Sequence, residues 1–452
     1  MIAKLSGAIK GDSLEQRAMR SSLLNVGSFG AYQGLRLLSN LILTRILFPE
    51  AFGMMALVTV FMVGLAMFSD MGTSPAILQS KRGDDPDFLN TAWTLHVIRG
   101  GVLWVFACLL AYPVSLLYEE PALALYLPVA SLMLVLNGFN PTKFETANRH
   151  LRTGRVALVE ILTQLFGLIV AIILAWQTQS VWALVISGVT GALAQLWLIH
   201  RLIDGPRNRF RLEPEAVKEL FQFGKWLFLS TLCGFMISQG DKVILGKYLS
   251  LDQFGVYNIG YFLASFPLML GWVVIRRVVI PVHRESPPKE SPENFARLRK
   301  MRFFVTAMLV GMLVVVGLLG PSLVTLMYDE RYLQAGAIVS ALAVMQIPQV
   351  IVMTYDQSAL AEGDSQNFFF LVATRAVVMT VALLLGFEIA GLFGALMAQG
   401  VASLSVYPGA VWLARKQGAW DRLHDLVFFV ASAVAGASVY WLHWAEISTL
   451  IQ

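Results

Sequence analysis

Residues 41–53, LILTRILFPEAFG, have a counterpart 202 positions later in residues 243–255, VILGKYLSLDQFG. A basic residue, an acidic residue and a Phe-Gly pair occupy equivalent positions in the two stretches. A second pair of matching stretches, LLYEEPAL at 116–123 and LMYDERYL at 326–333, is separated by 210 positions. Two matches at nearly the same offset indicate an internal duplication of about half the chain.

The amino-acid composition indicates whether such a chain folds in water or in a membrane. Hydrophobic residues make up 57% of the 452 residues and charged residues only 14%, against about 25% in soluble proteins. The mean hydropathy is +0.66. Because a bilayer core about 30 Å thick accepts apolar helices of about 20 residues, the composition predicts a multi-pass membrane protein. Cys108 and Cys233 both lie in apolar runs, so no disulfide scaffold is indicated.

Apolar windows predict about thirteen transmembrane helices. They lie at 21–46, 51–70, 92–115, 121–139, 156–176, 181–203, 225–247, 253–276, 303–327, 334–357, 367–387, 390–413 and 422–442. Each copy of the duplication holds six of them, so both copies enter the membrane from the same side. The predicted fold is therefore all-α integral membrane, with two six-helix bundles related by a parallel internal repeat, plus about one extra C-terminal transmembrane helix.

The basic residues predict the orientation. Most of the 34 lysines and arginines lie in the N-terminal arm or in alternate connections, at 77–91, 140–155, 201–225, 276–302 and 414–422. By the positive-inside rule the N-terminus is expected in the cytoplasm and, with thirteen spans, the C-terminus outside. Counting the spans puts the connection 358–366 on the cytoplasmic side, yet this connection has no basic residue. The arm lacks the apolar core and cleavage site of a signal peptide, and we expect it to be retained.

These patterns predict five segments along the chain. They are a cytoplasmic N-terminal arm at 1–20, an N-lobe at 21–203 with spans 1–6, a basic cytoplasmic linker at 204–224, a C-lobe at 225–413 with spans 7–12, and a C-terminal extension at 414–452 with span 13. In the extension, the small-residue run at 431–438 favours close helix packing. The high pI, about 9.1, reflects the orienting residues and does not indicate nucleic-acid binding.

Polar side chains inside the predicted spans indicate a hydrated cavity, because an ionised side chain at bilayer depth costs about 3 kcal/mol. Gln33, Arg36 and Asn40 share one face of the first span. The seventh span carries Asp241 in a similar polar stripe. Since these two helices open the two copies of the repeat, their stripes are predicted to face a central cavity. Further candidates for this cavity are His96, Arg99, Gln346 and Arg375, with Asp70 near the end of the second span.

Each candidate has a structural alternative. The deep arginines could form ion pairs between helices, for example Arg99 with Asp70. Asp241 and Lys242 could neutralise one another. Asp70 lies near a helix end, where capping or fixing a loop is an alternative to ion binding.

Sequence motifs give no support to an enzyme. The segment from Gly240 to Lys247 has the wrong spacing for a P-loop, and G-x-S-x-G, H-E-x-x-H and Cys-x-x-Cys are absent. The six histidines are scattered. We therefore expect no catalytic residue, no cofactor and no resident metal. The outer connections are all predicted to be short, whereas a membrane glycosyltransferase or polymerase is expected to carry a sizeable outer loop.

A family resemblance rests on the first eighty residues. Residues 43–57, LTRILFPEAFGMMAL, followed by DMG at 70–72 and AILQ at 76–79, resemble the opening of bacterial polysaccharide transporters. These are the O-antigen and exopolysaccharide (Wzx-type) flippases of the multidrug/oligosaccharidyl-lipid/polysaccharide (MOP) exporter superfamily. The resemblance extends more diffusely over about 20–415. It implies a protein of the bacterial inner membrane that moves undecaprenyl-pyrophosphate-linked oligosaccharide to the outer leaflet by alternating access of two lobes. In the related lipid II flippases two extra helices form a groove for the lipid tail, whereas this chain has one extra helix.

The resemblance also suggests roles for the polar residues. A guanidinium binds a pyrophosphate through bidentate contacts, so Arg36, Arg99 and Arg375 are the predicted head-group site. Gln33, Asn40, Asp241 and Gln346 would line the cavity and contact sugar hydroxyls, and His96 would line it as well. Without a nucleotide site, energy would come from an ion gradient, the membrane potential or the substrate concentration, and Asp70 or Asp241 could couple a cation.

The implied partners are the lipid-linked oligosaccharide, membrane lipids and the machinery that polymerises or exports the polysaccharide, with no nucleic acid. The product would serve O-antigen, capsule or exopolysaccharide biosynthesis. The alternatives are a cation-coupled multidrug exporter of the same superfamily, which favours an acidic or aromatic cavity, and a membrane glycosyltransferase or polymerase. A non-transporting scaffold of a capsule assembly complex would not need deep arginines.

Overall fold

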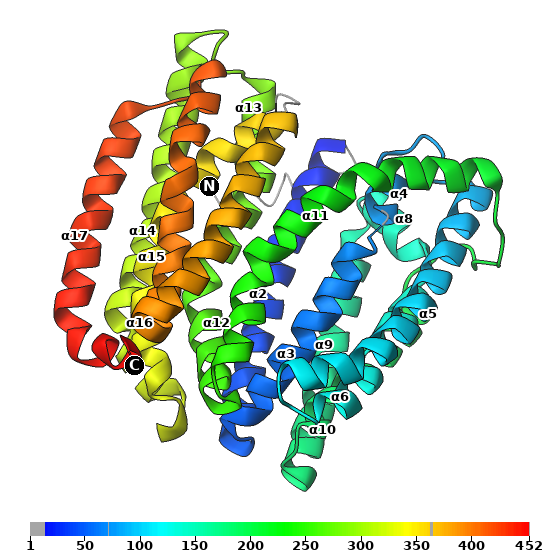
Figure 1. Ribbon diagram of the computed structural model, residues 1–452. Helices are drawn as coiled ribbons and strands as arrows, with labels where there is room; N and C mark the ends of the chain where they lie inside the picture. Colours follow the sequence, from blue (N-terminus) through cyan, green and yellow to red (C-terminus); the bar gives the residue numbers. More distant parts are fainter. Residues whose placement is uncertain (1–13, 71, 362–364, 452) are drawn as a thin grey trace. The chain divides into compact units, whose positions relative to one another are not determined.

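The computed structural model describes residues 14–70, 72–361 and 365–451, with side chains except in 14–26, 222–230, 277, 356–361 and 365 (Figure 1). All secondary structure in the described residues is helical. The transmembrane-length helices are α2 (Leu14–Ile46), α3 (Pro49–Phe68), α5 (Pro86–Leu117), α9 (Thr153–Thr178), α10 (Trp182–Leu202), α11 (Pro214–Tyr248), α12 (Leu251–Val274), α14 (Pro292–Met327), α15 (Gln334–Ala361), α16 (Ser365–Lys416) and α17 (Arg422–Ile447). The shorter ones are α4 (Thr73–Gln79), α6 (Leu123–Ala130), α7 (Leu132–Gly138), α8 (Lys143–Arg149), the π-turn η1 (Ile275–Val279), α13 (Ile280–Glu285) and the 3₁₀ turns η2 (Glu330–Tyr332) and η3 (Ser448–Ile451).

The helices confirm the all-α membrane fold. Within the described residues, nine helices are long and apolar enough to cross a membrane, or ten if the bent pair of α6–α7 with α8 forms one span. One of the nine, α16, has 52 residues and is interrupted by non-helical backbone at Ala390 and Gly391, so it contains two of the predicted spans. The predicted apolar windows coincide with helices of the structure, including α2 for 21–46, α11 for 225–247 and the pair α6–α7 for 121–139.

The two sequence matches coincide with repeated local structure. Helix α3 begins at Pro49 and α12 at Leu251, 202 positions later. Helix α5 is capped at its C-terminus by Tyr118 and α14 by Tyr328, 210 positions later. Equivalent sequence thus starts and ends equivalent helices in the two halves, as a parallel duplication requires.

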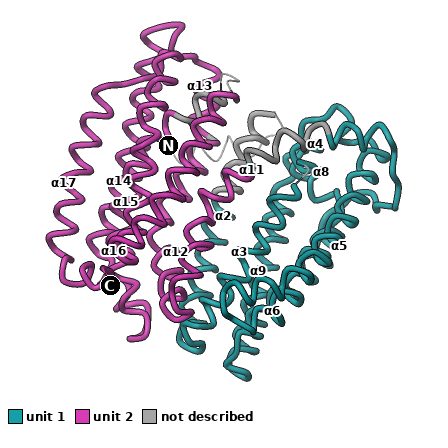
Figure 2. The backbone as a smooth tube through the Cα atoms, in the orientation of Figure 1, with its two compact units in different colours: residues 1–231 teal, residues 232–452 magenta. Residues whose placement is uncertain are grey.

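The chain divides into two compact units, Met1–Thr231 and Leu232–Gln452, and the division falls inside α11 (Figure 2). In unit 1, α9 packs along α2 and α10, and α5 packs on α6 and α7. In unit 2, α15 contacts α12, α14, α16 and α17. The apolar window at Glu330–Tyr355 is 89% buried, so α15 forms the core of this unit.

The segment before α11, residues 206–213, is fixed to the start of α5. Three of its backbone amides donate to α5 side chains: Arg209 N to Asn90 Oδ1 (2.9 Å), Arg211 N to Thr94 Oγ1 (3.0 Å) and Glu213 N to Thr91 Oγ1 (3.0 Å). Glu213 also pairs with Arg82 at 2.6 Å. The Arg82 guanidinium holds the pKa of the neighbouring Asp85 carboxyl below its usual range, so this cluster is charged at neutral pH. The segment is therefore a strap along unit 1 and not a free tether.

Removing the hydroxyls that hold this strap should loosen it measurably. In the double variant Thr91→Val and Thr94→Val, two hydrogen bonds of about 1 kcal/mol each are lost with little change of shape. We expect amide hydrogen exchange in 207–213 to become faster, by about fivefold for each bond lost. Thr59→Val is the matched control, because among the described residues Thr59 donates its hydroxyl only to the Met55 carbonyl of its own helix α3. Unchanged exchange in the double variant would contradict the strap.

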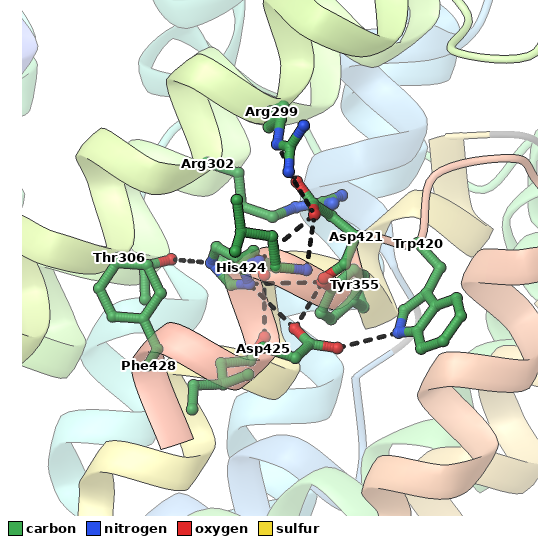
Figure 3. A network of polar contacts seen from close by, with 12 residues as sticks. Arg299, Arg302, Thr306, Tyr355, Trp420, Asp421, His424, Asp425 and Phe428 are labelled. Atoms are coloured by element: carbon green, nitrogen blue, oxygen red, sulfur yellow. Dashed lines mark hydrogen bonds and ion pairs between the residues drawn. The ribbon is translucent and has the colours of Figure 1, made fainter. Parts of the chain in front are cut away.

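The N-terminus of α17 is fixed to the rest of unit 2 by a buried network of polar side chains (Figure 3). The Asp425 carboxylate accepts hydrogen bonds from Tyr355 OH (2.6 Å), Tyr407 OH (2.6 Å) and Trp420 Nε1 (2.9 Å). His424 Nδ1 lies 2.9 Å from the same carboxylate, which leaves Nε2 to accept from the Thr306 hydroxyl at 2.9 Å. The network joins α14, α15, α16 and α17.

A buried arginine completes this network. Arg302 of α14 is 1% exposed, and its Nη1 donates to the Ala419 carbonyl at 2.6 Å. Its guanidinium lies over the Tyr355 ring at 4.3 Å from the centroid, a cation–π contact. One turn earlier, Arg299 pairs with Asp421 at 2.7 Å, and Asp421 caps α17 by accepting from the amides of residues 423 and 424. Two arginines of α14 thus hold the turn that leads into α17.

Candidate functional site

Unit 2 contains a polar cluster at membrane depth, built by α11, α12, α15 and α16. Asp241 of α11 is 2% exposed, and Tyr257 of α12 donates its hydroxyl to Asp241 Oδ2. The other oxygen, Oδ1, is buried with no hydrogen-bond partner in the described part of the chain. A buried carboxylate with an unused oxygen has capacity for a proton, a cation or a ligand hydroxyl.

A second tyrosine connects Asp241 to the other side of this cluster. Tyr261 lies one helical turn after Tyr257, near both Asp241 and Arg375 of α16. Its hydroxyl is hydrogen-bonded with Ser265 and Gln399. Lys242 places its Nζ 4.6 Å from the centre of the Tyr261 ring and 3.3 Å from Gln239 Oε1.

The two remaining predicted residues of unit 2 lie in the same cluster. Gln346 of α15 is fully buried and donates its Nε2 to Ser265 Oγ at 3.2 Å. Its Oε1 has no hydrogen-bond partner in the residues described. Arg375 is 8% exposed. The structure therefore brings Asp241, Gln346 and Arg375 together around the two tyrosines.

In unit 1 the Arg99 guanidinium lies at the C-terminal end of α3. Its Nε donates to Ser69 Oγ at 2.9 Å and its Nη2 to the Ala66 carbonyl at 2.5 Å. A cation at this position is favoured, because the last carbonyls of a helix carry a partial negative charge. Two of the five N–H groups are used in this way, which leaves others for a ligand.

Asp70 fixes the turn that follows α3. Its Oδ1 accepts from the amide of Gly72 at 2.9 Å, and Gly72 has the positive φ of 64° that glycine accommodates best. The carboxylate lies close enough to Arg99 to act on it electrostatically. Asp70 therefore has a local structural role, whatever further role it has.

The other predicted residues of unit 1 lie on α2 and α5. Gln33 is buried and Arg36 is exposed on α2, and the Asn40 carbonyl accepts from the Thr44 hydroxyl at 2.7 Å. At His96, α5 comes close to α7, since a Cβ on Gly138 would lie 2.6 Å from the His96 carbonyl oxygen. Of the three predicted head-group arginines, Arg36 and Arg99 thus belong to unit 1 and Arg375 to unit 2.

Sequence reasoning missed the tyrosines of the cluster. Tyr257, Tyr261 and Ser265 follow one another at intervals of four, which places them on one face of a helix. That spacing was available as a signal, but tyrosines in a membrane helix usually indicate an interface belt. In the described residues, no group of three or more His, Cys, Asp or Glu side chains is arranged to hold a metal ion.

Comparison with protein families gives a match over most of the chain. A family model described as "Polysaccharide biosynthesis protein" matches residues 42–337. This range includes both copies of the repeated motif, at 41–53 and 243–255, apart from Leu41.

Three characterised relatives share low but extended similarity. The teichuronic acid biosynthesis protein TuaB of Bacillus subtilis is 22% identical over 67% of this chain and 62% of its own length. The succinoglycan biosynthesis transport protein ExoT of Rhizobium meliloti is 22% identical over 81% of this chain and 73% of its own length. The lipopolysaccharide biosynthesis protein WzxC of Escherichia coli is 22% identical over 80% of this chain and 73% of its own length. The chain thus spans less than two thirds of the first of these proteins.

Solved structures with the same fold are transporters. The lipid II flippase MurJ in an inward closed conformation aligns with a TM-score of 0.67 at 14% identity, covering 95% of this chain and 96% of MurJ. An inward-facing multidrug resistance MATE family transporter of the MOP superfamily aligns with a TM-score of 0.62 at 15% identity, covering 86% of this chain and 95% of the transporter. At these identities the likeness establishes the fold.

Proposed function

Because the chain belongs to the family of polysaccharide biosynthesis proteins and has the fold of MOP transporters, we propose that it is a flippase for a lipid-linked polysaccharide precursor. The proposed substrate is an oligosaccharide on undecaprenyl pyrophosphate, moved from the cytoplasmic to the outer leaflet. ExoT, a relative, is itself named a transport protein. The observation that carries the proposal is the buried polar cluster of Asp241, Gln346 and Arg375. In this cluster Asp241 and Gln346 each keep a buried oxygen without a hydrogen-bond partner in the described residues, which leaves capacity for a ligand.

Arginines and acidic residues have separate roles in this proposal. Arg36, Arg99 and Arg375 bind the pyrophosphate, for which a guanidinium supplies paired donors. Asp241 couples transport to a cation or proton, since one of its oxygens has no hydrogen-bond partner in the described residues. Asp70 is the weaker candidate for coupling, because its Oδ1 already accepts from Gly72. Gln33, Asn40, His96 and Gln346 line the aqueous path.

The proposed location is the bacterial inner membrane, with the N-terminus in the cytoplasm. The distribution of lysines and arginines supports this orientation. In this proposed orientation the strap at 206–213 lies on the cytoplasmic side.

Deletion and complementation in the source bacterium test the function. We expect deletion of the gene to remove the surface polysaccharide and to cause accumulation of undecaprenyl-pyrophosphate-linked glycan. The native chain should restore export, and Arg36→Ala should not. Arg45→Ala is the matched control on the same helix, because Arg45 lies in the last turn of α2, where it can reach the interface. The measurements are sugar analysis of the cell surface and of extracted lipids. Normal surface polysaccharide in the deletion strain would contradict the proposal.

A cation-coupled multidrug exporter is the second candidate, favoured by the grouping of Asp241 with Tyr257 and Tyr261. Such a protein would expel ethidium in a manner that depends on Asp241, and deletion of the gene would leave surface polysaccharide unchanged. Ethidium accumulation in the same strains separates the two functions.

A further inference from the structure

Unit 1 contains a cavity of about 290 Å³ between α2, α7, α9 and α10. Its polar lining consists of uncharged side chains only, namely Ser39, Asn137, Thr163, Gln164, Ser187 and Gln195. We call this cavity the amide pocket. It lies wholly within unit 1 and shares no residue with the Asp241 cluster.

The three amide side chains of the pocket lack protein partners. Asn137, Gln164 and Gln195 form no side-chain hydrogen bond with any described residue, and the buried Thr163 hydroxyl has none either. Gln164 lies 11 residues after the start of α9, roughly 16 Å along the helix at 1.5 Å per residue, which is about half of a 30 Å hydrocarbon core. At that depth an unsatisfied amide is costly, so Gln164 needs water or a polar ligand.

The pocket is kept open by residues without side chains. Gly167 and Gly191 line it, and a Cβ added to Gly191 would meet no atom within 4 Å. At about 30 Å³ per water molecule, the volume equals about ten waters and is near the lower limit of small-ligand pockets. It has room for one small polar group such as a sugar ring.

We propose that the amide pocket binds a neutral sugar residue of the transported glycan. Amides and hydroxyls offer donors and acceptors together, as the hydroxyl groups of a sugar require. The lack of any charged lining residue makes the pocket a poor site for the pyrophosphate, which is left to the arginines. This assignment rests on the proposed flippase function and deepens it, because it separates recognition of the sugar from recognition of the anionic head group.

Two variants alter the pocket in different ways. Gln164→Leu removes an amide while keeping a similar volume. Gly191→Leu fills the open space. Gly101→Leu is the matched control, because Gly101 also lies in a transmembrane helix with no atom within 4 Å of an added Cβ. Expression level and apparent Tm in detergent identify any variant that fails to fold, and either pocket variant is sufficient for the test.

The assay compares two probes in proteoliposomes: undecaprenyl pyrophosphate without sugar, and the undecaprenyl-pyrophosphate-linked oligosaccharide extracted from the source bacterium. We expect both pocket variants to transport the sugar-bearing lipid at least about fivefold more slowly, as expected for the loss of about 1 kcal/mol of hydrogen bonding. Transport of the sugar-free lipid and of both lipids by Gly101→Leu should be unchanged.

Other outcomes overturn the proposal. Equal slowing of both lipids would mean that the pocket serves the structure or the common path, and no slowing of either would mean that it holds only water. If the native protein moves neither lipid, the flippase function itself fails and the sugar site fails with it. If the native protein moves both and only the sugar-site expectation fails, the flippase function stands.

Discussion

Arg99→Ala is expected to reduce translocation of the lipid-linked glycan by about 30-fold or more, with lipid-linked precursor accumulating in the cell. Loss of a charge-assisted hydrogen bond costs about 2 kcal/mol, and in a membrane interior no water replaces the guanidinium fully. Arg99→Lys keeps the charge but not the paired donors, so we expect an intermediate rate. The measurement is translocation in proteoliposomes together with the surface polysaccharide of complemented cells.

The geometry of Arg99 supplies the control. Since Arg99 donates to Ser69 Oγ, Ser69→Ala removes that structural hydrogen bond and leaves the guanidinium in place. If Arg99 binds substrate, Ser69→Ala should transport nearly normally. If Arg99 serves only to hold the end of α3, Ser69→Ala should show part of the same transport defect. Arg99→Ala should then also lower the Tm clearly, because its transport defect would result from lost stability. That second pattern would remove Arg99 from the head-group site.

Asp425→Ala is expected to have the largest effect on stability, about 3 kcal/mol or more. The variant leaves Tyr355, Tyr407 and Trp420 without the carboxylate to which they donate, and leaves the buried Arg302 with less compensating charge. The apparent Tm in detergent should fall by several degrees, and hydrogen exchange should become faster across 420–430.

The control for this variant is Asp204→Ala. Asp204 forms an exposed ion pair with Arg155, and such pairs contribute about 0–1 kcal/mol. Equal Tm values for the two variants would show that the network around Asp425 does not hold α17.

The sequence predicted most of the fold for a simple reason. A membrane helix must satisfy its backbone internally and present apolar side chains to lipid, so each span leaves a continuous apolar window. The duplication was visible because the residues that begin α3 and α12 are retained at the same offset. The sequence also divided α16 into two spans, at 367–387 and 390–413, next to the break at Ala390–Gly391, whereas the exact ends of the helices are less visible.

Tertiary contacts between polar residues could not be read in this way. Arg302 counts in the sequence as one more basic residue of a loop, yet it is buried against Tyr355 and the chain before α17. Nothing in the sequence joins positions 302, 355 and 425, because the packing of three helices brings them together. The same holds for the strap at 206–213: its arginines indicated a linker, whereas its backbone hydrogen bonds to α5 depend on the folded unit. Of the predicted site, Asp241, Gln346 and Arg375 lie together in unit 2, and His96, Arg99 and Asp70 lie close enough in unit 1 to interact electrostatically.

The anchorage of α17 has a consequence for the evolution of such chains. A protein of this fold that ended after its twelfth helix would leave an arginine at position 302 and tyrosines at 355 and 407 without the acceptors that Asp425 and the Ala419 carbonyl supply. Loss of the thirteenth helix must therefore be accompanied by apolar replacements at all three positions, or by some other carboxylate brought to the same place. The last helix and these three upstream residues therefore depend on one another, and we expect a graft between homologues to keep its stability only if it carries them together.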